Sequence, residues 1–229
     1  MTRTSRAPIV VGVDVGGPKK GFHAVALREG QFFERFATLD VREVVAWCRK
    51  LDASAVGIDA PCCWSRTDRA RPCERALATE GIHAFATPSQ AVGERHPFYR
   101  WMRNGADLYR LIMLHYPLFD GQYSTSSLVC FETFPHGVAC ALARAILSAK
   151  HKCSDRRRLL CEAGLSIDSL TNIDMVDAAL CALAAHHLLA GTIKTYGDAE
   201  EGLIVVPKLC VAQDFGRKRS TASDRASRS

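Results

Sequence analysis

The order of local patterns near the start of the chain constrains its fold more than any other feature. Residues 9–15 form an apolar, largely β-branched run, which is typical of a strand buried on both faces. Residues 22–28 and 31–38 are also strand-like, and Glu29-Gly30 between them suits a hairpin turn. The sequence therefore predicts three consecutive strands, the last two joined as a hairpin.

A helix and a fourth strand follow, which completes an order that few common folds share. Asp40 is a suitable cap for a helix over about 41–51, and residues 55–60 are again strand-like. Residues 62–127 have helical and loop patterns rich in Arg, His, Pro and aromatic residues, and we interpret them as a helical insertion beside the sheet. A fifth strand is expected at 128–133. The fold class indicated is α/β, with a mixed sheet of about five strands flanked by helices.

The C-terminal third is predicted to be mostly helical. Helices are expected at about 137–149, 155–163 and 173–190, and a short strand at 202–207. The last of these helices is so apolar that it must be largely buried. No internal repeat is visible, which indicates one structural unit and not two similar halves.

Length and composition fit a single domain, which we place at residues 9–210. With 229 residues, 48% of them hydrophobic and 24% charged, the chain can bury a sizeable core. No apolar run approaches the roughly 20 residues that span a membrane, and the start lacks the apolar stretch of a signal peptide. We therefore expect a cytoplasmic protein without membrane association, and we interpret its ten cysteines as reduced.

The net charge of +6 is concentrated at the two ends of the chain. Residues 216–229 carry a net +4 and two N-terminal arginines add +2, which leaves zero for residues 7–215. The basic segment 211–229 and the segment 1–8 are predicted to be disordered tails. Loose contact of the basic tail with phosphates fits this composition, whereas residues 7–215 are not globally basic.

Three carboxylates lie in apolar runs, near the C-terminal ends of predicted strands: Asp14 in VVGVDVGG, Asp59 in VGIDAP and Glu132 in LVCFETFP. An unpaired buried carboxylate is costly, and active sites of open α/β sheets gather at the carboxyl ends of strands. On neighbouring strands, about 4.8 Å apart, such carboxylates converge and repel one another, and a divalent cation relieves the repulsion. The pattern indicates a site for Mg²⁺ or Mn²⁺, which oxygen ligands favour.

A fourth candidate acid lies on the apolar helix IDMVDAALCALAAHHLL. Asp174 and Asp177 are three residues apart and share a face of this helix. Thr171 and Asp174 have the spacing of a capping box, which gives Asp174 a structural explanation at the helix start. Asp177 has no such explanation, so we expect Asp177 to be the ligand and keep Asp174 in reserve.

Each acid also has a structural interpretation. A single acid at a strand end is more often a cap or a salt-bridge partner than a ligand. For Glu132 this interpretation has about equal weight, because its strand ends at Pro135 and Arg and Lys partners are plentiful. Four such acids in this order favour a site over four unrelated contacts.

The order of these acids, Asp, Asp, Glu and a late helical Asp, resembles that of the RNase H-like superfamily of nucleases, resolvases and transposases. More narrowly, several segments look like domain-of-unknown-function family 429, described as predicted nucleases of RNase H fold. They are GVDVGGPKKGFHAVAL, GIDAPCCW, RPCERAL, TPS, FYRWMRNGADLY, FETFPHGV and DMVDAALCALAA. The resemblance implies an RNase H-like fold and, as metal-binding and catalytic acids, Asp14, Asp59, Glu132 and Asp177. Arg71 and Glu74 match a further motif, in which we expect Glu74 to support the first turn of its helix.

The function expected on these grounds is a metal-dependent nuclease or phosphodiesterase, which hydrolyses a nucleic-acid phosphodiester through a carboxylate-bound two-metal site with Mg²⁺ or Mn²⁺. Lys19, Lys20 and Arg71 are candidate contacts for a substrate phosphate, although Lys19 and Lys20 also suit a solvated hairpin tip. The sequence does not choose between DNA, RNA and a small phosphoester, and it is silent on oligomeric state.

Two alternatives have other chemistry. An Asp followed by Gly-Gly and a hairpin also resembles the first phosphate loop of sugar-kinase and Hsp70-like ATPases, but those proteins clasp ATP between two such halves and this chain has room for one. A non-catalytic nucleic-acid- or protein-binding module on the same fold is the other alternative. Cations beside aromatic residues in the insertion suit base stacking. We favour the interpretation that Phe98, Trp101, Tyr109 and Leu111 form the insertion's own core, with the arginines facing solvent.

Overall fold

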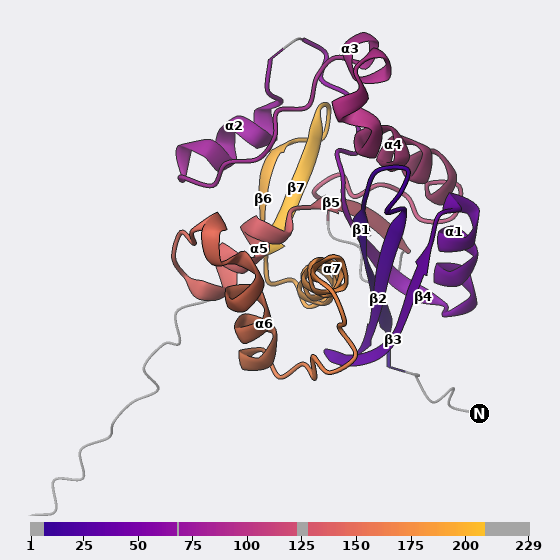
Figure 1. Cartoon of the computed structure of the whole chain (residues 1–229), viewed down its shortest axis with the longest axis vertical. Helices are drawn as coiled ribbons and strands as arrows, with labels where there is room; N and C mark the ends of the chain where they lie inside the picture. Colours follow the sequence, from indigo (N-terminus) through magenta and orange to yellow (C-terminus); the bar gives the residue numbers. More distant parts are fainter. Residues whose placement is uncertain (1–6, 68, 123–127, 209–229) are drawn as a thin grey trace, which may run out of the picture.

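The computed structural model describes residues 7–67, 69–122 and 128–208. Its centre is a seven-stranded sheet in the order β3-β2-β1-β4-β5-β7-β6 (Figure 1). The strands are β1 (Ile9–Val15), β2 (Phe22–Arg28), β3 (Gln31–Thr38), β4 (Ala53–Asp59), β5 (Val129–Thr133), β6 (Ile193–Asp198) and β7 (Gly202–Pro207). β1, β4, β5 and β7 are parallel neighbours, whereas β2, β3 and β6 pair antiparallel. The predicted α/β class with a mixed sheet is confirmed.

β2 and β3 form the predicted hairpin. Glu29 and Gly30 connect them with φ angles of 53° and 75°. Two-residue turns of this hand match the twist of paired strands, and Gly30 tolerates the positive φ without cost. β3 alternates between exposed and half-buried residues along its whole length, as expected of a strand at the edge of the sheet.

Helices cover both faces of the sheet. α7 (Ile173–Leu189) packs on β1, β2 and β4, and is seen nearly end-on in Figure 1. α1 (Val41–Lys50) and α4 (Arg100–Ile112) cover the opposite face. The side chain of Asp40 accepts a hydrogen bond from the backbone N–H of Arg42, so the predicted cap of α1 is confirmed.

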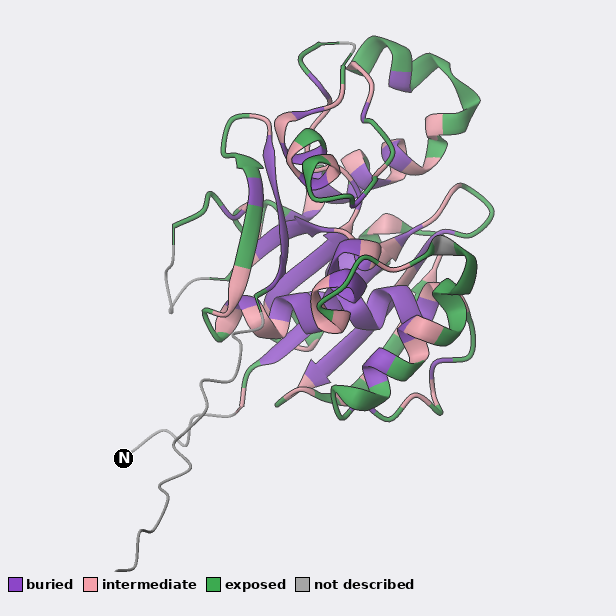
Figure 2. Ribbon diagram, turned by 90° about the vertical axis from the view of Figure 1, so that its left-hand side faces the viewer, coloured by how far each residue is buried: buried purple, intermediate pink, exposed green. Residues whose placement is uncertain are grey.

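α7 lies directly on the strands because two glycines leave room for its backbone. A Cβ atom at Gly12 would lie 2.1 Å from the carbonyl oxygen of Ala178, and one at Gly57 would lie 2.7 Å from that of Cys181. Most residues of α7 and of the central strands are buried, and no residue of α7 is exposed (Figure 2). α7 starts at the end of the sheet where β1 and β4 finish. Asp174, the second residue of α7, therefore lies close to Asp14, near the end of β1.

The segment between β4 and β5 stands at this same carboxyl edge of the sheet, at the top of Figure 1. It contains α2 (Pro72–Thr79), α3 (Gln90–Arg95), the 3₁₀ helix η1 (Pro97–Tyr99) and α4. The side-chain amide of Asn104 donates to the carbonyl of Gly16 at 2.8 Å, which ties α4 to the loop after β1. Gly105 allows α4 to approach Ala60 closely at the end of β4.

Some boundaries differ from the sequence-based expectation. The sheet has seven strands and not about five, because β6 pairs with β7 as a second hairpin. β6 was missed because only Tyr196 in it is buried, so the strand lacks an apolar signature. The remaining helical segments are α5 (Pro135–Ala143), η2 (Ala149–His151) and α6 (Lys152–Glu162). α5 is shorter than predicted because Arg144, with φ 53°, ends it in a left-handed conformation.

The predicted tails fall largely on residues that the structure does not describe, namely 1–6 and 209–229. Over the described ranges, no helix is long and apolar enough to cross a membrane. The described residues form one sheet, so the pair of similar halves that an ATP-clasping fold requires does not occur among them.

Candidate metal centre

The end of the sheet holds the first two predicted acids side by side. Asp14 and Asp59 are register partners on the adjacent parallel strands β1 and β4. Gly12 and Gly57, two residues earlier, face α7, so the alternation of strand side chains directs both acids towards α7 as well. Their backbones are therefore one strand spacing, about 4.8 Å, apart.

The start of α7 brings Asp174 to the same place. Ligand atoms of Asp14, His23 and Asp174 all lie within 4.8 Å of one another. His23 belongs to β2, where it is the register partner of Asp14. Asp177, one turn further along α7, is close enough to raise the pKa of Asp14 by charge repulsion.

Asp174 is not needed as a cap. Asn172 is the N-cap of α7, and its side chain accepts from the backbone N–H of Met175 at 2.8 Å. The predicted capping box of Thr171 and Asp174 is wrong, because Thr171 lies outside the helix and its hydroxyl accepts from Arg35 at 2.9 Å. The side chain of Asp174 is thus not used as a helix cap, and it lies close to Asp14.

The acidic cluster consists of the carboxylates of Asp14, Asp59, Asp174 and Asp177. Lys20 Nζ lies 2.8 Å from one oxygen of Asp174 and 3.2 Å from the other. Arg156 of α6 forms an ion pair with Asp177, and both side chains are nearly buried. Among the described residues, no hydrogen bond or ion pair involves the carboxylates of Asp14 and Asp59. The two cations pair with Asp174 and Asp177, so neither Asp14 nor Asp59 has a counter-charge in direct contact among the described residues.

This imbalance is visible in the pKa values. Burial and, to a smaller extent, repulsion by Asp177 and Asp174 raise the pKa of Asp14 to about 8. Burial and the charge of Asp14 raise the pKa of Asp59 well above its usual range. Both carboxylates would ionise normally beside a cation that faces them. The all-carboxylate donor set fits a hard divalent cation such as Mg²⁺ or Mn²⁺.

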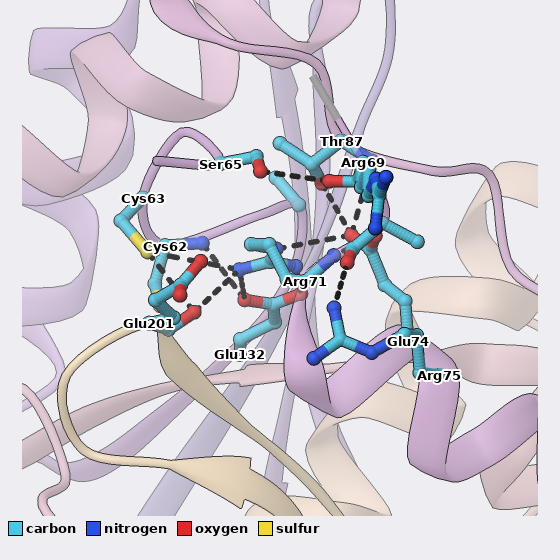
Figure 3. A network of polar contacts seen from close by, with 12 residues as sticks. Cys62, Cys63, Ser65, Arg69, Arg71, Glu74, Arg75, Thr87, Glu132 and Glu201 are labelled. Atoms are coloured by element: carbon cyan, nitrogen blue, oxygen red, sulfur yellow. Dashed lines mark hydrogen bonds and ion pairs between the residues drawn. The ribbon is translucent and has the colours of Figure 1, made fainter. Parts of the chain in front are cut away.

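Glu132 has partners other than the four aspartates, although it lines a small cavity together with Asp59 and its charge contributes to the raised pKa of Asp59. Its register partner on β4 is Ile58, whose side chain lies in the core on the α1 and α4 face. Glu132 therefore points away from α7, and it is held from three sides: Arg71 Nη2 at 2.5 Å, Arg71 Nη1 at 2.9 Å and the backbone N–H of Cys62 at 2.9 Å (Figure 3). Both of its oxygens accept hydrogen bonds from protein groups.

Arg71 is the centre of a buried network, not a surface cation. Its side chain is 1% exposed and lies between Glu132 and Glu74, with Nε 3.0 Å from Glu74 Oε1 (Figure 3). Glu74 also accepts from the backbone N–H of Arg71 at 2.9 Å, so its predicted support of the first turn of α2 is confirmed. The N–H and hydroxyl of Thr87 donate to Glu74 as well. The network ties the insertion to the end of β5.

The two lysines of the first loop differ from each other. Lys19 is exposed, whereas Lys20 pairs with Asp174, which raises the pKa of Lys20 mainly through the hydrogen bond. Lys20 therefore borders the acidic cluster, and a phosphate bound there would compete with Asp174 for it.

Sequence reasoning missed His23 and Arg156. His23 follows from the hairpin pairing of β1 with β2, because the residue opposite Asp14 is fixed once the register is known. Its Nδ1 atom is buried and has no hydrogen-bond partner in the part of the chain that is described. Arg156 has no comparable signal, since it lies on a separate helix and meets Asp177 through tertiary packing.

Fold and site together define an α/β protein with an acidic cluster at the carboxyl edge of a mixed sheet. The chain belongs to the family described as "Protein of unknown function (DUF429)", whose model matches residues 12–201. No curated protein matches the chain. A solved structure similar to this one is "Thermus thermophilus RuvC structure", at 13% identity and a TM-score of 0.42, covering 80% of this chain and 95% of that chain.

Proposed function

We propose that this protein is a metal-dependent phosphodiesterase that acts on nucleic acid, with Asp14, Asp59, Asp174 and Asp177 as ligands of Mg²⁺ or Mn²⁺. The observation that carries the proposal is the pair Asp14 and Asp59, aligned on adjacent strands without a partner among the described residues and facing two further acids. Divalent cations in such a site supply charge stabilisation to a phosphate and activate water.

The four carboxylates differ in the contacts that they already make in the structure. Asp14 and Asp59 have no competing contact among the described residues, so they are the primary ligands. Asp174 shares its oxygens with Lys20, which is 61% exposed and free to turn towards a substrate phosphate. Asp177 is oriented by Arg156, whose charge and hydrogen bond oppose the rise in the pKa of Asp177 that burial causes.

His23 borders the cluster as a neutral base. Burial lowers its pKa, although the charge of Asp174 opposes this. A neutral imidazole has one nitrogen that is able to accept a proton, and a ring nitrogen of His23 lies within 4.8 Å of carboxylate oxygens of Asp14 and Asp174. In the proposal Glu132 and Arg71 stabilise the structure, since their contacts are with each other.

The proposal is tested by titrating Mn²⁺ into the wild type, Asp59→Asn and the control Asp107→Asn, an exposed acid on α4. Thermal stability and cleavage of a panel of DNA, RNA and hybrid substrates are followed together. At 100 times the dissociation constant, bound metal stabilises by about 2.7 kcal/mol, which we expect for the wild type and the control only. Equal metal stabilisation of Asp59→Asn would refute the site, and absence of cleavage would refute the activity in favour of a binding module.

A further inference from the structure

Two aromatic side chains of the insertion are exposed instead of forming its core. Phe85 is 67% exposed and Phe98 is 50% exposed. Their rings meet edge to face, with centroids 5.6 Å apart, and Phe98 meets Tyr99 in the same way at 5.1 Å. The expectation that Phe98 belongs to the insertion's core is therefore wrong, whereas Tyr109 is buried as predicted. Exposed aromatic groups of this kind need an explanation.

Phe85 shares a cavity with Asp59, one member of the acidic cluster, and with the buried network of Arg71, Glu74 and Glu132. This cavity, of about 50 Å³, is also lined by Trp101 of the insertion. The cavity is too small for a nucleobase, so a base that reaches this point would lie over Phe85 at its mouth. The sugar and phosphate of that nucleotide would then lie within reach of Asp59 at the carboxyl edge of the sheet.

The segment that carries Phe85 and Phe98 has a net positive charge. Residues 84–103 contain three arginines and a single acid, Glu94. Arg95 and His96 line a second hollow, of about 310 Å³, on the same segment, and Arg100 is exposed directly after Tyr99. Flat aromatic groups interleaved with cations complement a polymer that has aromatic faces and anionic phosphates.

We propose that Phe85 and Phe98 form a stacking platform for an unpaired base, so that the substrate is single-stranded nucleic acid or an unpaired segment. This rests on the proposed function, because it assigns the substrate class of the same site. In a duplex each base face is covered by its neighbours, whereas an unpaired base offers a free face to an aromatic side chain. The three arginines of residues 84–103 neutralise the adjoining phosphates.

The test measures binding in EDTA, where cleavage does not interfere. A fluorescein-labelled 12-nucleotide strand and the blunt duplex of the same sequence are compared by fluorescence anisotropy. The proteins are the wild type, Phe85→Ala, Phe85→Trp, Phe98→Ala and the matched control Phe33→Ala, which removes an exposed ring from β3. Circular dichroism and thermal midpoints confirm that each variant is folded.

We expect the wild type to prefer the single strand. Stacking of one base is worth about 1–3 kcal/mol, so Phe85→Ala and Phe98→Ala should bind the strand roughly 5- to 150-fold more weakly. Phe85→Trp should retain binding and Phe33→Ala should equal the wild type. Equal affinity for strand and duplex, or unchanged affinity of Phe85→Ala, would overturn the inference. So would a change of oligomeric state in Phe98→Ala without loss of strand binding, because the rings would then contact a second copy of the chain.

The two proposals fail differently. If the wild type binds the single strand through Phe85 but cleaves nothing with Mn²⁺, the proposed activity is wrong and the platform stands. If the wild type cleaves duplex and single strand alike, and Phe85→Ala does so at the same kcat/KM, the platform is wrong and the activity stands.

Discussion

Replacement of Glu132 by glutamine distinguishes between two roles of this side chain, a structural one and metal binding. The wild-type side chain accepts three hydrogen bonds, two from Arg71 and one from the N–H of Cys62. The amide retains one oxygen, so at least one bond from the guanidinium is lost and the others change to a neutral acceptor. Hydrogen bonds to charged groups contribute about 1.5–3 kcal/mol each, and we expect a total loss of about 3 kcal/mol. Arg71 keeps Glu74 as a counter-charge, which limits the damage.

For a domain of this length a loss of 1 kcal/mol lowers the melting temperature by about 2–4 °C, so Glu132→Gln should melt roughly 6–12 °C below the wild type without metal. Calorimetry checks this. The control is Glu200→Gln, which removes an exposed ion pair and should lower the free energy of unfolding by about 1 kcal/mol or less. The increment in melting temperature on adding Mn²⁺ should equal that of the wild type. Wild-type stability combined with loss of the Mn²⁺ increment would refute the structural role and return Glu132 to the metal site.

Three further outcomes are expected. Asp14→Asn should stabilise the metal-free protein by about 1 kcal/mol or more at pH 8 and should have little effect near pH 4. The reason is that Asp14 ionises near pH 4 in the unfolded chain and near pH 8 in the folded chain, so the folded state loses stability as the pH rises across that range. Urea titrations that give the same difference between variant and wild type at both pH values would contradict this. A hydrogen bond with Cys62 and the charge of Arg71 lower the pKa of Cys63 to about 7, against the effect of burial. The rate at which iodoacetamide alkylates Cys63, followed by peptide mass spectrometry with Cys63→Ser as control, should therefore be half-maximal near pH 7. A midpoint near pH 8.5 would contradict this. Gly12→Ala should destabilise by about 3 kcal/mol or more because its Cβ meets the backbone of α7, whereas Gly17→Ala, with no atom within 4 Å of its Cβ, should be neutral in the same unfolding assay.

The first half of the fold was predictable because its signals are local. Apolar runs, the Glu29-Gly30 turn and the Asp40 cap fix β1 to β4 and α1 without long-range information. The alignment of Asp14 with Asp59 follows from the shared ends of two parallel strands. β6 was not predictable in this way, since it depends on pairing with β7 and not on its own composition.

The composition of the acidic cluster depends on contacts that no local pattern encodes. Whether Glu132 faces α7 or α4 depends on the register between β4 and β5, which the long insertion leaves open. Asp174 meets Lys20 across 154 residues of sequence, so its role as a cap or as a cluster member could not be separated in advance. The partners Arg71 and Arg156 decide which carboxylates are already neutralised, and both meet their acids only in the folded chain.

The position of the cation is the central claim, and anomalous diffraction from crystals grown with Mn²⁺ tests it most directly. We predict an anomalous peak within about 2–2.5 Å of carboxylate oxygens of Asp14 and Asp59, on the α7 face of the sheet, with Asp174 or Asp177 completing the ligands. The ion pair of Arg71 with Glu132 should remain intact in the same crystals. A peak at Glu132, or no peak near Asp14 at millimolar Mn²⁺, would contradict the account.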